Sequence, residues 1–314
     1  HIGFLSATVV TVGTGEAATA YTIGGLASAM VGPAMAVAIG SALQAPALVL
    51  FSLVPVGYAT NILGGAGGPL AVLVIALVAA ECGKAGSKET KVDIVTVLVG
   101  IGVAYLVAPP IGSAASWVGT LLMWATELQP FFMGILVSVI VGIALTLPIS
   151  SAAICAALGL TGLAGGAAVA GCCAQMVGFA VLSFRENRWG GLVSQGLGTS
   201  MLQMGNIVRN PRIWIPPTLA SAITGPIATC LFRLEMNGTP VSSGMGTCGL
   251  VGPIGVYTGW VEDIAAGLRT SIGGMDWLGL VLICFVLPGV LTWLLGIPCR
   301  KAGWIKEGDL KLED

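Results

Sequence analysis

Residues 237–257 are NGTPVSSGMGTCGLVGPIGVY, and this stretch decides how the rest of the chain is interpreted. It carries no charged residue and is about as long as the ~20 residues that one transmembrane helix needs. Its six glycines and two prolines nevertheless interrupt helical hydrogen bonding along its whole length. Non-helical backbone persists at membrane depth only when protein buries it or it lines a cavity. We therefore predict a re-entrant hairpin next to a small-molecule site.

The polar side chains of this stretch are the first candidates for contact with a small polar solute, and they are Asn237, Thr239, Ser242 and Ser243. Amides and hydroxyls can hydrogen-bond a polyol without placing a charge in the bilayer. The alternative is a continuous glycine-rich helix whose small residues allow close packing. In that case the serines would have no role in binding.

The composition places the chain in a membrane. Of its 314 residues, 56% are hydrophobic and 9% are charged, and the mean hydropathy is +0.96, whereas a soluble domain has about 25% charged residues. The 47 glycines and the aromatic content of 6% favour closely packed helices over a β-barrel with aromatic girdles. We predict an all-α polytopic bundle, with residues 1–298 as the transmembrane domain and 299–314 as a cytoplasmic tail.

Clusters of lysine and arginine predict which loops face the cytoplasm, because these residues concentrate on the inner side of membrane proteins. Three such clusters lie at 84–91, 185–188 and 300–311. We expect all three to be cytoplasmic, in a multi-pass protein of the bacterial inner membrane. The segment around 262–276 is then external.

The cationic sites at 185–188 and 209–212 enclose only about twenty residues. If both sites are cytoplasmic, the segment between them enters the membrane and returns without crossing it. Gln203 and Asn206 lie on this segment and are further candidates for solute binding.

Two more polar residues are candidates for the same site. Asn61 begins NILGGAGGP at 61–69, which is either an ordinary loop or a counterpart of 237–257. Glu16 stands among Gly, Ala and Thr, and a carboxylate at the bilayer centre costs about 2.5–3.5 kcal/mol. It therefore faces a cavity or a partner, unless it is simply an acidic residue at a helix N-terminus near the membrane surface.

Small residues at four-residue spacing predict close helix packing. One such face comprises Gly32, Ala36 and Gly40, and a longer one, which predicts a buried helix, comprises Gly162, Gly166, Ala170, Ala174 and Gly178.

Residues 150–184 have room for two short spans. The pair Pro109-Pro110 is expected to end a span that starts at residue 92, leaving 113–127 as an interfacial helix. Both halves share an order of small-residue helix, glycine-rich break and proline-rich helix, a plan typical of inverted repeats.

Residue types also exclude several chemistries. His1 is the only histidine, so neither a histidine relay nor a zinc site can be built. The eight cysteines form no CxxC pair, and a net charge of −1 offers no basic face to nucleic acid. We expect no catalytic residue, no metal and no cofactor.

Three long strings carry a family resemblance, and they are LPISSAAICAALGLTGLAGGAA at 147–168, MLQMGNIVRNPRIWIPPTLASAITGP at 201–226 and NGTPVSSGMGTCGLVGPIG at 237–255. In these strings the chain resembles the enzyme IIC-like membrane proteins of the bacterial sugar phosphotransferase system. The branch is the one labelled perfringolysin regulator-like or putative toxin regulator. The resemblance is close over 147–257 and looser over the first half.

The resemblance implies a sugar-conducting membrane carrier that works with a separate IIB-type phosphoprotein, and we expect a homodimer in contact with lipid. The chain lacks the histidine that glucose-type IIC domains share near the bound sugar. Phosphoryl transfer by this chain alone is therefore not supported. Two other functions stay open, namely an ion- or proton-coupled transporter using Glu16 or Glu235, and a membrane sensor that controls gene expression through a partner.

Overall fold

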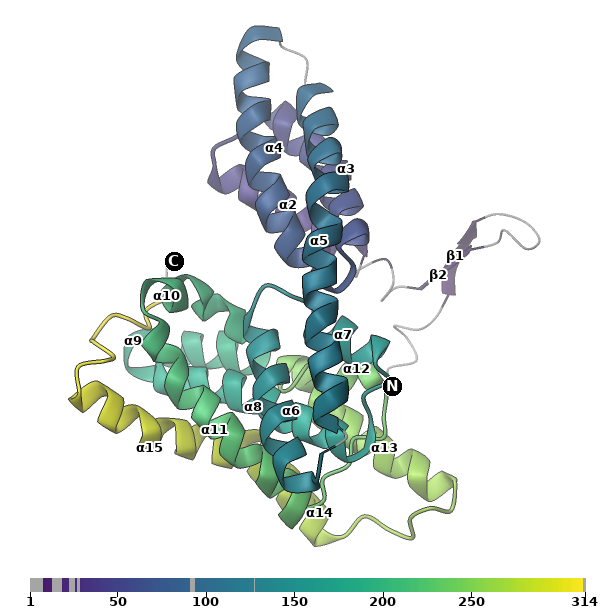
Figure 1. Ribbon diagram of the computed structural model, residues 1–314, viewed down its shortest axis with the longest axis vertical. Helices are drawn as coiled ribbons and strands as arrows, with labels where there is room; N and C mark the ends of the chain where they lie inside the picture. Colours follow the sequence, from purple (N-terminus) through teal and green to yellow (C-terminus); the bar gives the residue numbers. More distant parts are fainter. Residues whose placement is uncertain are drawn as a thin grey trace. The chain divides into compact units, whose positions relative to one another are not determined.

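The computed structural model describes residues 8–12, 19–22, 26, 29–90, 94–126 and 128–312. The chain forms two compact units, residues 1–114 and 115–314, and Figure 1 shows that helices dominate both. The described strands, β1 (Thr8–Val12) and β2 (Thr19–Thr22), form a short antiparallel hairpin. The predicted all-α bundle is confirmed.

The first unit is built from α2 (Val31–Ala42), α3 (Ala47–Gly64), α4 (Gly68–Thr90) and the beginning of α5 (Ile94–Thr126). Gly32, Ala36 and Gly40 are buried as predicted. A Cβ atom on Gly57 would lie 2.7 Å from the Cβ of Ala36, so α2 and α3 depend on glycine at their contact. The break at 61–69 is a tight turn, Gly65–Gly67, between α3 and α4.

Helix α5 differs from the prediction, because Pro109 and Pro110 lie inside it and it continues to Thr126. The expected stop at these prolines was wrong. Proline fixes φ near −65°, which a helix accepts, so its cost comes from the missing N–H donor and from the clash of its ring with the carbonyl one turn earlier. Membrane helices tolerate such gaps when neighbouring groups pair with the freed carbonyls.

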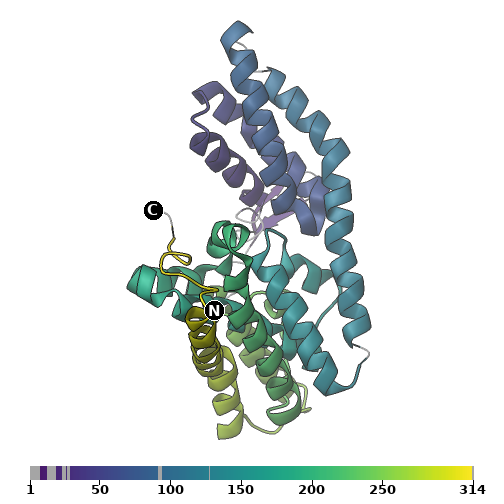
Figure 2. The same ribbon diagram turned by 60° about the vertical axis from the view of Figure 1, so that its left-hand side comes forward.

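The second unit surrounds α8 (Gly162–Leu182), which packs against α6 (Pro130–Thr146), α11 (Ile215–Pro226) and α15 (Leu287–Lys301). Figure 2 shows these helices side by side. The predicted buried helix is confirmed, since nearly every residue of α8 from Gly165 onward is buried. A Cβ atom on Gly171 would collide with the backbone carbonyl of Ser138 on α6.

Shorter elements fill the remainder of the second unit. They are α7 (Ser151–Ala157), α9 (Phe184–Val193), α10 (Met204–Arg209), α12 (Pro240–Ser243), α13 (Val251–Ala265) and α14 (Gly274–Val281). Residues 150–184 therefore hold one span, α8, rather than two, because α7 has only 7 residues. Turns of π-helix interrupt the longer helices and connections at Ser194–Gly198, Ile227–Leu231 and Leu282–Val286.

Length and hydropathy make several helices suitable for crossing a bilayer. Five segments of the described residues qualify, and they are Ala47–Gly64, Gly68–Gly86, Val95–Thr126, Gly162–Leu182 and Gly274–Lys301. The shorter helices Val31–Ala42 and Pro130–Thr146 are also apolar. These helices indicate a multi-pass membrane protein, as the composition predicted.

Candidate functional site

The stretch 237–250 is not a continuous helix. It contains the single turn of α12 and a short 3₁₀ turn, Cys248–Leu250, before α13 begins at Val251. Gly246, Gly249 and Leu250 have positive φ angles of 52°, 52° and 60°, a left-handed conformation that ends regular helix. The alternative of one glycine-rich packing helix therefore does not hold for these residues.

The short helix α12 packs against α7, and two serine hydroxyls join them to each other's loops. Ser151 Oγ donates to the carbonyl of Gly244 at 2.8 Å, and Ser243 Oγ donates to the carbonyl of Leu160 at 2.6 Å. The backbones of Gly162 and Met236 exchange two hydrogen bonds of 3.0 Å beside them. We call residues 148–162 together with 234–250 the paired loops.

The two paired loops contain the same short sequence, Pro-Ile/Val-Ser-Ser, which the glycine pattern does not reveal. Pro148-Ile149-Ser150-Ser151 leads into α7, which begins at Ser151, and Pro240-Val241-Ser242-Ser243 forms α12. A search for P-[I/V]-S-S would have found Ser151 as the counterpart of Ser243. The repeat is short, and its meaning comes from the contact between the two copies.

The four candidate residues of 237–243 differ in how free they are to meet a solute. Ser243 is fully buried and committed to Leu160, whereas Ser242 shares a 3.0 Å hydrogen bond with exposed Thr239. Asn237 is half-buried, and its Nδ2 donates to Asp263 Oδ2 at 2.8 Å. Asn237 and Thr239 are thus the more accessible members of the group.

A second polar feature, Gln175, lies in the middle of α8 and was not singled out from the sequence. Its side chain is fully buried, and Oε1 accepts from Trp214 Nε1 at 3.0 Å and from Thr146 Oγ1 at 3.4 Å. Thr146 Oγ1 is also 2.9 Å from Ser200 Oγ. A glutamine in an otherwise apolar span was the available signal, since buried polar groups in membranes are costly and tend to be functional.

The third feature is a chain of buried amides made by Gln195, Gln203 and Asn206. Gln203 Nε2 donates to Gln195 Oε1 at 3.0 Å, and Asn206 Nδ2 donates to Gln203 Oε1 at 2.8 Å. Gln195 Nε2 in turn donates to Ser183 Oγ at 2.8 Å. We call this set the amide chain.

A cavity of about 570 Å³ lies beside the amide chain, within the size range of small-molecule sites. Its lining comes from α9, α10 and residues near the C-terminal end, including Asn206, Ser194, Arg209 and Lys311. Asn187 and Asn206 both hydrogen-bond to residues 310–312, so the two ends of the segment between them meet the same short stretch.

The predicted site residues fall into separate groups. The residues of 237–243 lie in the paired loops, and Gln203 and Asn206 lie in the amide chain. No direct hydrogen bond joins these groups among the described residues, but the π-turn Ser194–Gly198 packs against Cys248–Leu250. Asn61 belongs to the first unit, where it lies next to Gly68. Glu16 lies outside the described residues.

The described residues contain no group of three or more His, Cys, Asp or Glu side chains that could hold a metal ion. The polar groups collected in the second unit are mainly amides and hydroxyls. Such groups can hydrogen-bond a neutral solute.

Residues 2–312 match the family described as "Phosphotransferase system, EIIC". The chain belongs to the phosphotransferase system EIIC family. No curated protein and no solved structure matches it in addition. Family membership makes the chain a membrane carrier subunit of a phosphotransferase system, in agreement with its long apolar helices.

Proposed function

We propose that this EIIC subunit moves a sugar or a related neutral polyol across the bacterial inner membrane. The uncharged polar interior of the second unit carries the proposal. Gln175, Thr146, Ser221 and the amide chain place amide and hydroxyl groups inside an apolar helical bundle. A polyol offers matching donors and acceptors, whereas an ion would call for a compensating charge.

The paired loops supply the recognition site in this proposal, and Asn237 and Thr239 make the first contacts. Broken helices near a substrate site are typical of membrane carriers, because backbone freed from a helix can serve a ligand. In the membrane, 237–250 and 184–209 then act as re-entrant segments. The cavity beside the amide chain is where the solute leaves.

A separate IIB-type phosphoprotein is the partner in this scheme, and it acts on the side that bears the cationic segments. Arg300 and Glu186 form an ion pair, with Nη1 and Oε1 3.1 Å apart, which brings 185–188 and 300–312 to one end of the second unit. We place that end in the cytoplasm by the positive-inside rule. We also propose a homodimer, with exposed apolar side chains such as Leu106 facing lipid or the second copy.

Uptake into vesicles that contain the purified subunit tests the function. A panel of radiolabelled hexoses and hexitols is supplied with and without phosphoenolpyruvate and the soluble phosphotransferase proteins. We expect one class of sugar to accumulate as its phosphate only when these components are present. Uptake driven by a pH gradient without phosphoenolpyruvate would instead favour a proton-coupled transporter. Absence of flux for the whole panel would favour a sensor.

The site assignment is tested in the same vesicles. Asn237→Ala and Thr239→Val should each weaken apparent solute affinity by about 2- to 13-fold, the equivalent of one net hydrogen bond of about 0.5–1.5 kcal/mol. Ser271→Ala is the matched control, because Ser271 is exposed in the 266–273 loop. Unchanged affinity in both variants would move the solute away from the paired loops.

A further inference from the structure

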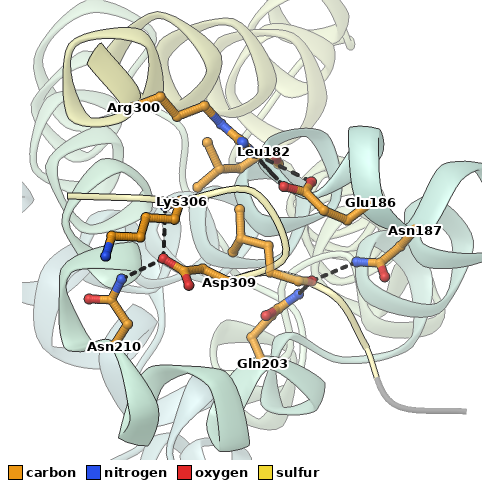
Figure 3. A network of polar contacts seen from close by, with 9 residues as sticks. Leu182, Glu186, Asn187, Gln203, Asn210, Arg300, Lys306 and Asp309 are labelled. Atoms are coloured by element: carbon orange, nitrogen blue, oxygen red, sulfur yellow. Dashed lines mark hydrogen bonds and ion pairs between the residues drawn. The ribbon is translucent and has the colours of Figure 1, made fainter. Parts of the chain in front are cut away.

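Residues 304–312, which we call the strap, are held on α9 and α10 largely through their backbone (Figure 3). Asn187 Nδ2 donates to the carbonyl of Leu310, and Asn187 Oδ1 accepts from the backbone N–H of Leu312, both at 2.8 Å. Asn206 Nδ2 donates to the carbonyl of Lys311 at 2.9 Å. Asparagine side chains thus bind the backbone of residues 310–312.

Three side-chain amides converge on two neighbouring strap carbonyls. Leu310 O accepts from Asn187 and also from Gln203 Nε2 at 3.0 Å, and Lys311 O accepts from Asn206. Gln203 is fully buried and Asn206 is 9% exposed. Without the strap, these buried N–H donors would need other oxygen atoms as acceptors.

The strap is linked through the amide chain to the paired loops. Gln203 Nε2 bonds to Gln195 Oε1 as well as to the strap, and Gln195 lies in the π-turn Ser194–Gly198. That turn packs against Cys248–Leu250. Movement of the strap would therefore be transmitted through Gln203 and Gln195 to the π-turn Ser194–Gly198, and from that turn to Cys248–Leu250.

The strap also forms one wall of the 570 Å³ cavity, through Lys311 and Leu312. Gly190 and Gly205 line other walls, and a Cβ atom added to either glycine would meet no atom within 4 Å. Departure of the strap would widen this cavity and expose the donors of Gln203 and Asn206 to it.

We propose that the strap is a latch at the inner end of the carrier. When bound, its carbonyls occupy the amide donors and hold the returning segment 184–209 in place. Hydroxyl oxygens of a polyol are equivalent acceptors, so a solute that reaches the cavity can replace the strap and then leave. This inference rests on the proposed function, since it assigns a control element to the same pathway.

A reversible crosslink tests the latch in the full chain. Asn187→Cys combined with Leu312→Cys places two thiols on contacting residues, and oxidation should lock the strap. We expect uptake of the sugar panel to fall at least 10-fold on oxidation and to recover on reduction. Each variant that carries only one of the two added cysteines is the matched control and should not respond. Equal uptake in the locked and reduced forms would overturn the latch.

Hydrogen exchange of the strap amides tests detachment without any transported solute. Asn187→Ala should accelerate exchange at 310–312 at least 10-fold and leave α8 unchanged. If the strap amides exchange no faster than those of α8 in both the wild type and Asn187→Ala, the strap opens only with global unfolding. That result would overturn the latch. If no sugar is taken up while the strap does open, the proposed function fails and the detachment stands.

Discussion

Ser243→Ala tests whether the two serine hydroxyls hold the paired loops together. Ser243 is fully buried, and its Oγ donates to the carbonyl of Leu160 at 2.6 Å. Alanine removes one oxygen and creates almost no cavity, so the cost comes from the unpaired buried carbonyl. Such a loss costs about 1–3 kcal/mol. We expect the free energy of unfolding to fall by about 2 kcal/mol, the middle of that range.

The surroundings of the related serines predict a ranking. Ser151→Ala should cost about as much as Ser243→Ala, because Ser151 is 3% exposed and bonds to Gly244 at 2.8 Å. Ser242→Ala should cost less, about 0.5–1 kcal/mol, because water can replace Ser242 at exposed Thr239. The double variant of Ser151 and Ser243 should be non-additive, since both hydroxyls hold one contact.

Unfolding is measured on the purified protein in detergent by denaturant titration, with a fluorescence or circular dichroism signal. Ser271→Ala is the control and should stay within about 0.5 kcal/mol of the wild type, as exposed substitutions do. If Ser243→Ala were as stable as this control, the hydroxyl would not hold the paired loops. If Ser242→Ala were the most damaging variant, the exposure of the hydrogen-bond partner would not decide the ranking.

Three other predictions concern packing, charge and topology. Gly171→Ala should destabilise by about 1–3 kcal/mol through collision with a backbone carbonyl of α6, whereas Gly190→Ala, which meets no atom within 4 Å, should be neutral or slightly stabilising in a thermal melt. Arg300→Ala should lower stability by about 3 kcal/mol, because it leaves a carboxylate that is 6% exposed without its partner; a loss below about 1 kcal/mol would class the pair as a surface salt bridge. In intact cells, a membrane-impermeant maleimide should label Ser271→Cys and leave Lys306→Cys unlabelled, and the reverse pattern would invert the topology.

Several features of this protein follow from the sequence by itself. Composition predicts a membrane protein, because too few charged residues are present to cover a soluble surface. The small-residue stripe from Gly162 to Gly178 predicts a buried helix, and α8 is that helix. The glycines of 237–250 predict a broken backbone, which α12 and the left-handed turns confirm. In each case the decisive property belongs to the residues themselves.

The tertiary structure decided which partners these elements meet. Pro109 and Pro110 lie inside helix α5. Each proline removes only its own backbone N–H donor, and whether the helix continues past it depends on how the surrounding residues pack. Gln203 and Asn206 were predicted as solute-binding residues. In the structure their side-chain amides donate hydrogen bonds to the backbone carbonyls of residues 310 and 311, more than one hundred residues away. Backbone carbonyls are the same in every residue, so no sequence pattern marks the one that a side chain will bind.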